Sequence, residues 1–178
     1  MRKQLFLIIL IISLVVVGNI SLAVCSEIKT LTDFKSSAFI KKYPQKKQMD
    51  SWALRDGRYN NSFSFSLGDD ADSWFSIEVV TTSATNPVIC HYGIMFHDES
   101  DPNIYPTKFT NQIKTVLYDF LKSLDSNVNI NEVIGYVNKR STVKCSQIAD
   151  APMKMFGKYS FRIGTVGYEL IISIDKKK

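Results

Sequence analysis

The longest helical pattern covers residues 106–124, where apolar side chains recur every three or four positions. This spacing predicts an amphipathic helix whose apolar stripe packs against another layer of the protein. A shorter pattern over residues 32–42, closed by Pro44, predicts a short N-terminal helix. Residues 131–140 are ambiguous, because their apolar spacing favours a second short helix while Gly135 disfavours one.

Strand patterns occupy most of the remaining chain. Phe63 and Phe65 alternate with serines, which indicates a strand with one apolar face and one hydroxyl face. Asp56-Gly57 and the segment 164–167 carry the residue types of hairpin turns. We therefore expect an α+β fold in which an antiparallel sheet of about five to seven strands packs against the 106–124 helix. The predicted strands are residues 62–67, 74–82, 88–96, 158–163 and 168–174.

The beginning of the chain has the tripartite pattern of a secretory signal peptide. Arg2 and Lys3 precede the uncharged run 5–17, and small residues then offer a cleavage site. The run is shorter than the ~20 apolar residues of a typical membrane-spanning helix. We expect cleavage after Ala23 or after Cys25, with an uncleaved N-terminal anchor as an alternative.

Three parts of the chain follow from this pattern. Residues 1–25 form the signal peptide, residues 26–175 a single α+β domain, and residues 176–178 a basic tail. Lipidation of Cys25 is a further alternative, although Val24 is not the small residue that usually precedes a lipidated cysteine. The mature protein is then periplasmic or secreted, with no membrane-spanning segment.

Composition narrows the class of protein. The chain has 178 residues, 45% of them hydrophobic and 22% charged, which excludes a disordered, collagenous or multi-span membrane protein. Its net charge of +5 arises from Arg2, Lys3 and the terminal run 176–178, so the domain itself is neutral. A neutral domain gives no reason to expect a nucleic-acid partner.

The expected export of the protein bears on the oxidation state of its cysteines. Export places Cys90 and Cys145 where thiols tend to pair, and a bridge between them would close a long loop. We therefore expect a Cys90–Cys145 disulfide, with two separate buried thiols as the alternative. Neither cysteine lies in a sequence typical of a catalytic nucleophile.

No recognisable catalytic or cofactor motif is present. His91 and His97 would share one face of a strand, but about 20 Å apart, which is too far for one metal ion. The chain has no nucleophile elbow, no paired cysteine motif and no phosphate-binding loop. We therefore assign no catalytic residue and no resident cofactor, and no motif identifies a family.

Two acidic loops should meet at one end of the sheet. If strands 74–82 and 88–96 form a hairpin, the loop before the first lies beside the loop after the second. Their carboxylates would repel one another, which favours binding of Ca²⁺ or of a basic partner, or acid–base catalysis by a carboxylate pair. The alternative is that these turn residues only face water. The six candidate residues are Asp69, Asp70, Asp72, Asp98, Glu99 and Asp101.

These observations favour an exported, non-enzymatic binding or accessory protein whose ligand is a protein or an envelope component. The absence of catalytic motifs and the 8 Tyr, 11 Phe and 2 Trp residues support this prediction. The alternative is a carboxylate-based hydrolase or a Ca²⁺-binding protein that uses the acidic loops.

Overall fold

A computed structural model of the chain describes residues 27–43, 45–48, 51–68, 73–85, 87–97 and 108–177. The predicted signal peptide and the candidate lipidation site Cys25 lie outside the described residues. The described part is an antiparallel sheet with a layer of helices on one face, which confirms the predicted α+β fold.

The eight strands of the described residues belong to one sheet. Seven of them follow the spatial order β1-β3-β4-β5-β8-β7-β6, and the short β2 pairs with β3. The chain therefore builds the sheet from two meanders that meet where β5 pairs with β8. The strands are β1 (Gln45–Gln48), β2 (Trp52–Ala53), β3 (Tyr59–Ser66), β4 (Trp74–Thr81), β5 (Ile89–His97), β6 (Lys154–Phe156), β7 (Tyr159–Val166) and β8 (Glu169–Lys176).

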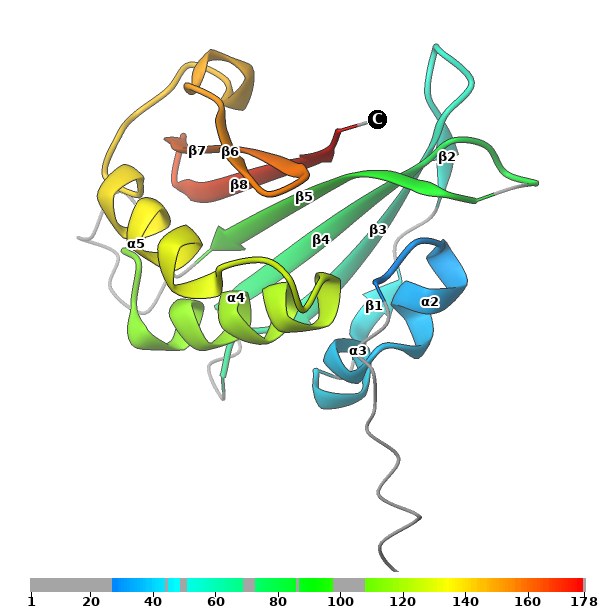
Figure 1. Cartoon of the computed structure of the whole chain (residues 1–178), viewed down its shortest axis with the longest axis horizontal. Helices are drawn as coiled ribbons and strands as arrows, with labels where there is room; N and C mark the ends of the chain where they lie inside the picture. The colour runs from blue at the N-terminus through cyan, green and yellow to red at the C-terminus, as the bar shows by residue number, and fades with distance from the viewer. Residues whose placement is uncertain are drawn as a thin grey trace, which may run out of the picture.

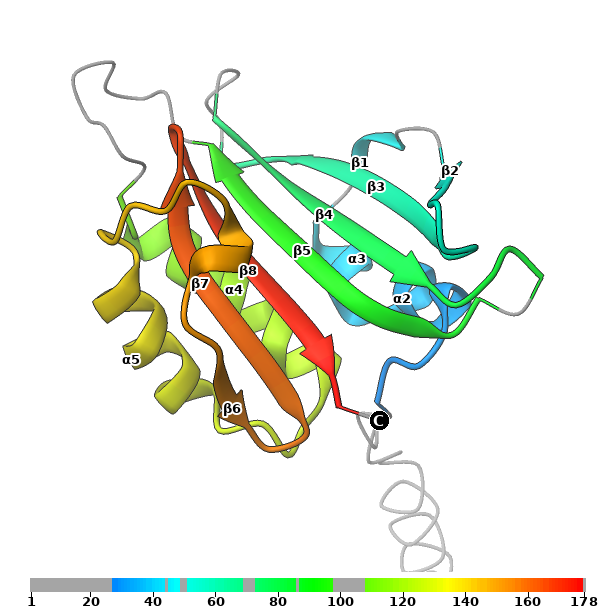
Figure 2. The same ribbon diagram turned by 90° about the horizontal axis from the view of Figure 1, so that it is seen from above.

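The α-helices lie on one side of this sheet, and a short 3-10 helix lies on the other. Figure 2 shows the sheet with α2, α3 and α4 behind it and with the 3-10 helix in front of β7 and β8. Among the described residues, no helix therefore covers the front face of β3, β4 and β5. The helices are α2 (Leu31–Ser36), α3 (Ala38–Lys42), α4 (Asn111–Leu124), α5 (Ile130–Arg140) and the 3-10 helix η1 (Ile148–Asp150).

Helix boundaries differ from the sequence prediction where a side chain caps the backbone. The predicted N-terminal helix is two helices, because Ser37 is extended and its hydroxyl accepts from the amide of Ile40, which begins a new helix. The main helix begins at Asn111 rather than at Pro106, since Thr110 caps it in the same way. The ambiguous segment 131–140 is helical, with Asn129 as its N-cap.

An aromatic cluster joins the helices to the sheet. Phe65 of β3 and Phe75 of β4 are fully buried and stack with ring centroids 4.7 Å apart. Phe39 of α3 contacts both rings edge-on and also meets Phe120 of α4, at 5.5 Å. Burying side chains of this size is the largest favourable contribution to such a core.

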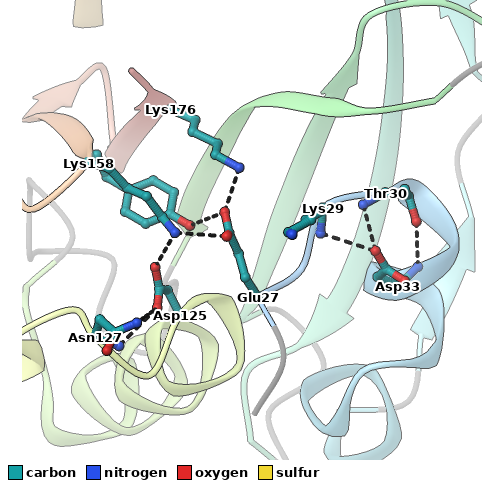
Figure 3. Close-up of polar contacts among 9 residues, drawn as sticks. Glu27, Lys29, Thr30, Asp33, Asp125, Asn127, Lys158 and Lys176 are labelled. Atoms are coloured by element: carbon teal, nitrogen blue, oxygen red, sulfur yellow. Dashed lines mark hydrogen bonds and ion pairs between the residues drawn. The ribbon is translucent and has the colours of Figure 1, made fainter. Parts of the chain in front are cut away.

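A cluster of ion pairs closes one end of the domain (Figure 3). Glu27, the first described residue, binds the amines of Lys158 and Lys176 and accepts a hydrogen bond from the hydroxyl of Tyr159. Lys158 also binds Asp125, which follows α4, at 2.8 Å. The cluster therefore ties the start of the domain to the β6–β7 turn, to the end of β8 and to the end of α4.

The carboxylates of this cluster have lowered pKa values. Burial alone would raise the pKa of Glu27, but the hydrogen bonds from Lys158 and Lys176 outweigh it and lower the pKa from 4.5 to about 2. The pKa of Asp125 is lowered as well, because the Lys158 and Asn127 hydrogen bonds overcome its burial. Lys176, assigned from the sequence to a basic tail, is thus the last residue of β8 and an ion-pair partner.

Candidate binding site

The face of the sheet that carries no α-helix is polar where the opposite face is apolar. Along β4, Phe75 and Ile77 point into the core, so Ser76 and Glu78 must point to the open side. The pairing register aligns this side into rows across the strands. One row joins Ser62, Glu78 and Gly93, the next joins Ser64, Ser76 and Met95, and the third joins Ser66, Trp74 and His97.

A hollow of about 430 Å³ lies on this face. Its polar lining comes from serines whose small side chains leave space above the strands, and Trp52 and Trp74 supply aromatic surface. Trp52 reaches the hollow because β2 pairs with β3 and places it opposite Asn60, on the same face as the serines. Its side chain is 43% exposed. The lining residues are Trp52, Ser62, Ser64, Trp74, Ser76, Glu78 and Met95.

Glu78 is the charged residue of this lining. Within the described part of the chain its carboxylate forms no hydrogen bond or ion pair. Gly93 lies opposite it on β5, and a Cβ atom at Gly93 would be 3.6 Å from Glu78 Oε2 and 3.7 Å from His91 Nε2. The missing side chain of Gly93 therefore leaves a small space between the carboxylate and the imidazole.

The two histidines hold separate positions on the open face. The register of β5 against β4 is continuous from His97 to His91, so both side chains point to the open side. His91 Nδ1 lies 2.8 Å from the carboxylate of Asp175 on β8. His97 stacks on Trp74, with centroids 5.1 Å apart, and its Nδ1 lies 3.6 Å from Glu169. The His97 contacts hold the Trp74 ring in place at one end of the hollow.

A second hollow, of about 450 Å³, runs along α5 beside β6. Its lining includes Lys154, Glu132 and Tyr136, but these groups already contact one another. The Lys154 amine lies 3.6 Å from Glu132 and 4.9 Å from the centre of the Tyr136 ring. Lys139 and Arg140 also line this hollow, so its charge is mainly positive, whereas the hollow on the sheet combines two tryptophan rings with a carboxylate.

The structure does not bring Cys90 and Cys145 together, and both are free thiols. Cys145 lies against Gly164, which pairs with Ile171, and Ile171 in turn pairs with Met95. Cys145 is therefore two strands from β5 and roughly 17 Å further along it than Cys90. A disulfide needs Cα atoms within about 7 Å. The predicted Cys90–Cys145 bridge is thus absent, because the two meanders place the cysteines at different levels of the sheet.

The candidate cation site lies outside the described residues, since its six carboxylates are at positions 69–72 and 98–101. In the part of the chain that is described, no group of three or more His, Cys, Asp or Glu side chains is placed to hold a metal ion. Among the same residues, no helix is long and apolar enough to cross a membrane.

The sequence predicted the hydroxyl face of β3 but not the hollow bordered by Trp52 and Trp74. The alternation of Phe63 and Phe65 with serines indicated an open hydroxyl face, and the structure has it. The same alternation on β4 could have placed Trp74 and Glu78 on that side. The Asp56-Gly57 turn signal indicated a hairpin at this point, but only the structure gives the register that sets Trp52 opposite Asn60, on the side of the serines.

Comparisons with known proteins add no relative: the chain matches no protein family, no curated protein and no solved structure.

Proposed function

We propose that this chain is an exported, non-enzymatic binding protein that holds a saccharide component of the cell envelope against the open face of its sheet. The observation that carries the proposal is the hollow bounded by Trp52 and Trp74 and lined by three serines and one carboxylate. Sites for small ligands combine apolar and aromatic walls with a few convergent polar groups.

The residues of this lining can contact both the apolar face and the hydroxyl edge of a sugar ring. A pyranose has an apolar C–H face, which packs on an indole ring, and hydroxyls at its edge, which hydrogen-bond to serine hydroxyls and carboxylates. Trp52 is suited to the first contact because it is 43% exposed. Serines suit the second because a hydroxyl can both donate and accept.

Direct titration tests the proposal. Uncharged tetrasaccharides of glucose and of N-acetylglucosamine are added to the purified protein, and binding is measured by calorimetry and by tryptophan fluorescence. We expect saturable binding of at least one of them, weakened at least tenfold by Trp52→Ala or Trp74→Ala.

Tyr118→Ala is the matched control, because Tyr118 is also 43% exposed but lies on α4, on the other side of the sheet. It should bind as the wild type does. Mass spectrometry of the recovered sugar should show an intact tetrasaccharide. Absence of binding by every tetrasaccharide, or equal loss in the Tyr118 variant, would contradict the proposed site, and cleavage of the sugar would contradict a purely binding role.

A further inference from the structure

We infer that the ligand of the open face carries a protonated amine that pairs with Glu78, so that the preferred saccharide is an amino sugar with a free amine. This inference rests on the proposed function and specifies the substrate class of the same hollow.

The Glu78 carboxylate is open to a ligand. It lines the hollow without a hydrogen-bond or ion-pair partner among the described residues. Of the other acidic groups on this face, Asp175 lies 2.8 Å from His91 Nδ1 and Glu169 lies 3.6 Å from His97 Nδ1. Glu78 differs from both in lining the hollow without such a neighbour among the described residues.

The arginine in the same row as Glu78 is occupied elsewhere. The row that contains Glu78 and Gly93 continues through Ser173 of β8 to Arg162 of β7. Arg162 donates to the carbonyl oxygens of Ala149 and Ala151 and so holds η1 over β7. It therefore does not serve as the counter-charge of Glu78. A ligand with a positive group would be attracted to this carboxylate, whereas an anionic ligand would be repelled by it.

Gly93 leaves space for a small group beside Glu78. The space over Gly93 adjoins Glu78 Oε2, and a Cβ there would lie 3.6 Å from that oxygen. A group about the size of an ammonium fits where the side chain is missing.

The experiment compares two ligands that differ only in this charge. The β-1,4-linked tetramer of glucosamine and its fully N-acetylated counterpart are titrated into the protein by calorimetry, in mildly acidic solution at low salt. Charge-assisted hydrogen bonds contribute about 1.5–3 kcal/mol, so we expect the amine tetramer to bind at least about tenfold more tightly.

Two substitutions locate the effect. Glu78→Gln keeps the shape of the side chain and should remove the preference for the amine. Glu132→Gln removes the same charge on α5, away from the open face, and should leave the preference intact. Gly93→Ala, whose added Cβ meets only ordinary contact distances, should fold normally and weaken binding of the amine tetramer more than that of the acetylated one.

The outcomes separate the two proposals. If both tetramers bind equally, or if the preference for the amine persists in Glu78→Gln, Glu78 does not recognise the amine. The proposed saccharide site is not contradicted by that result. If neither tetramer binds and the glucose tetramer binds, the inference alone is overturned. If no tetrasaccharide of either charge binds, both proposals are overturned.

Discussion

The two faces of the central sheet are made by the same strands but differ in composition and burial. On the helix side, β3, β4 and β5 contribute fully buried rings and aliphatic side chains such as Phe63, Ile77 and Phe96. On the open side the same strands contribute serines, Trp74 and Glu78. Stability therefore depends mainly on one face, which leaves the composition of the other free to serve binding.

Neighbouring residues on β4 give the sharpest test of this comparison and the largest expected effect. Phe75 is fully buried among four aromatic rings, so Phe75→Ala should lower the free energy of unfolding by about 3–5 kcal/mol. Ser76→Ala, one position along and on the open side, should lower it by less than about 1 kcal/mol. Urea unfolding monitored by circular dichroism measures both, and similar losses would contradict the division between the two faces.

An intermediate effect is expected at the ion-pair cluster on the rim of the helix side. Because folding lowers the pKa of Glu27 from 4.5 to about 2, its ionised form stabilises the folded state above pH 4.5. That contribution is lost as the pH falls from 4.5 towards 2. We expect Glu27→Gln to cost about 2 kcal/mol near neutral pH.

The pH dependence identifies the cause. The stability difference between the wild type and Glu27→Gln should shrink as the solution is acidified, and should vanish once Glu27 is protonated in the folded state. Glu132→Gln, which removes an exposed ion pair with Lys154, should change stability by less than about 1 kcal/mol at every pH. A Glu27 difference that is independent of pH would show that packing, rather than ionisation, is responsible.

The smallest effect is expected from reductant. Since the two free thiols lie far apart, the stability of both faces should come from noncovalent contacts alone. Dithiothreitol should leave the thermal midpoint unchanged, and thiol titration of the denatured domain should detect both Cys90 and Cys145. A lowered midpoint together with missing thiols would show that the protein is oxidised in a different arrangement.

Much of the fold could be predicted because its cues are local. The period of the apolar residues in 111–124 specified a helix, and the alternation in β3 specified which side chains face the core. The turn at Gly167, where φ is +63°, could be read from glycine because this backbone conformation strains other residues. Helix ends were less accurate, since several residues could have served as caps and only the structure shows that Thr110 and Asn129 do.

The candidate site was predicted only in part, because its chemistry depends on pairing between distant segments. Alternation alone placed the serines of β3 on a hydroxyl face. Trp52 joins them through the exact register of the β2–β3 hairpin, which the turn signal alone does not give. His91 meets Asp175 only because β5 pairs with the distant strand β8. The disulfide inferred from the expected compartment was wrong for the same reason. The strand pairing fixes where each cysteine lies along the sheet, and it places the two thiols far apart.

The sequence by itself determined where the main helix lies and which side chains of β3 alternate between an apolar and a hydroxyl face. Each of these properties follows from the geometry of a few consecutive residues. The tertiary structure decided which strands become neighbours, that the helices cover one face and leave β3, β4 and β5 open on the other, and that two tryptophans border one hollow. These properties depend on packing between residues far apart in the chain, where many arrangements satisfy the same local pattern and only the complete core selects one.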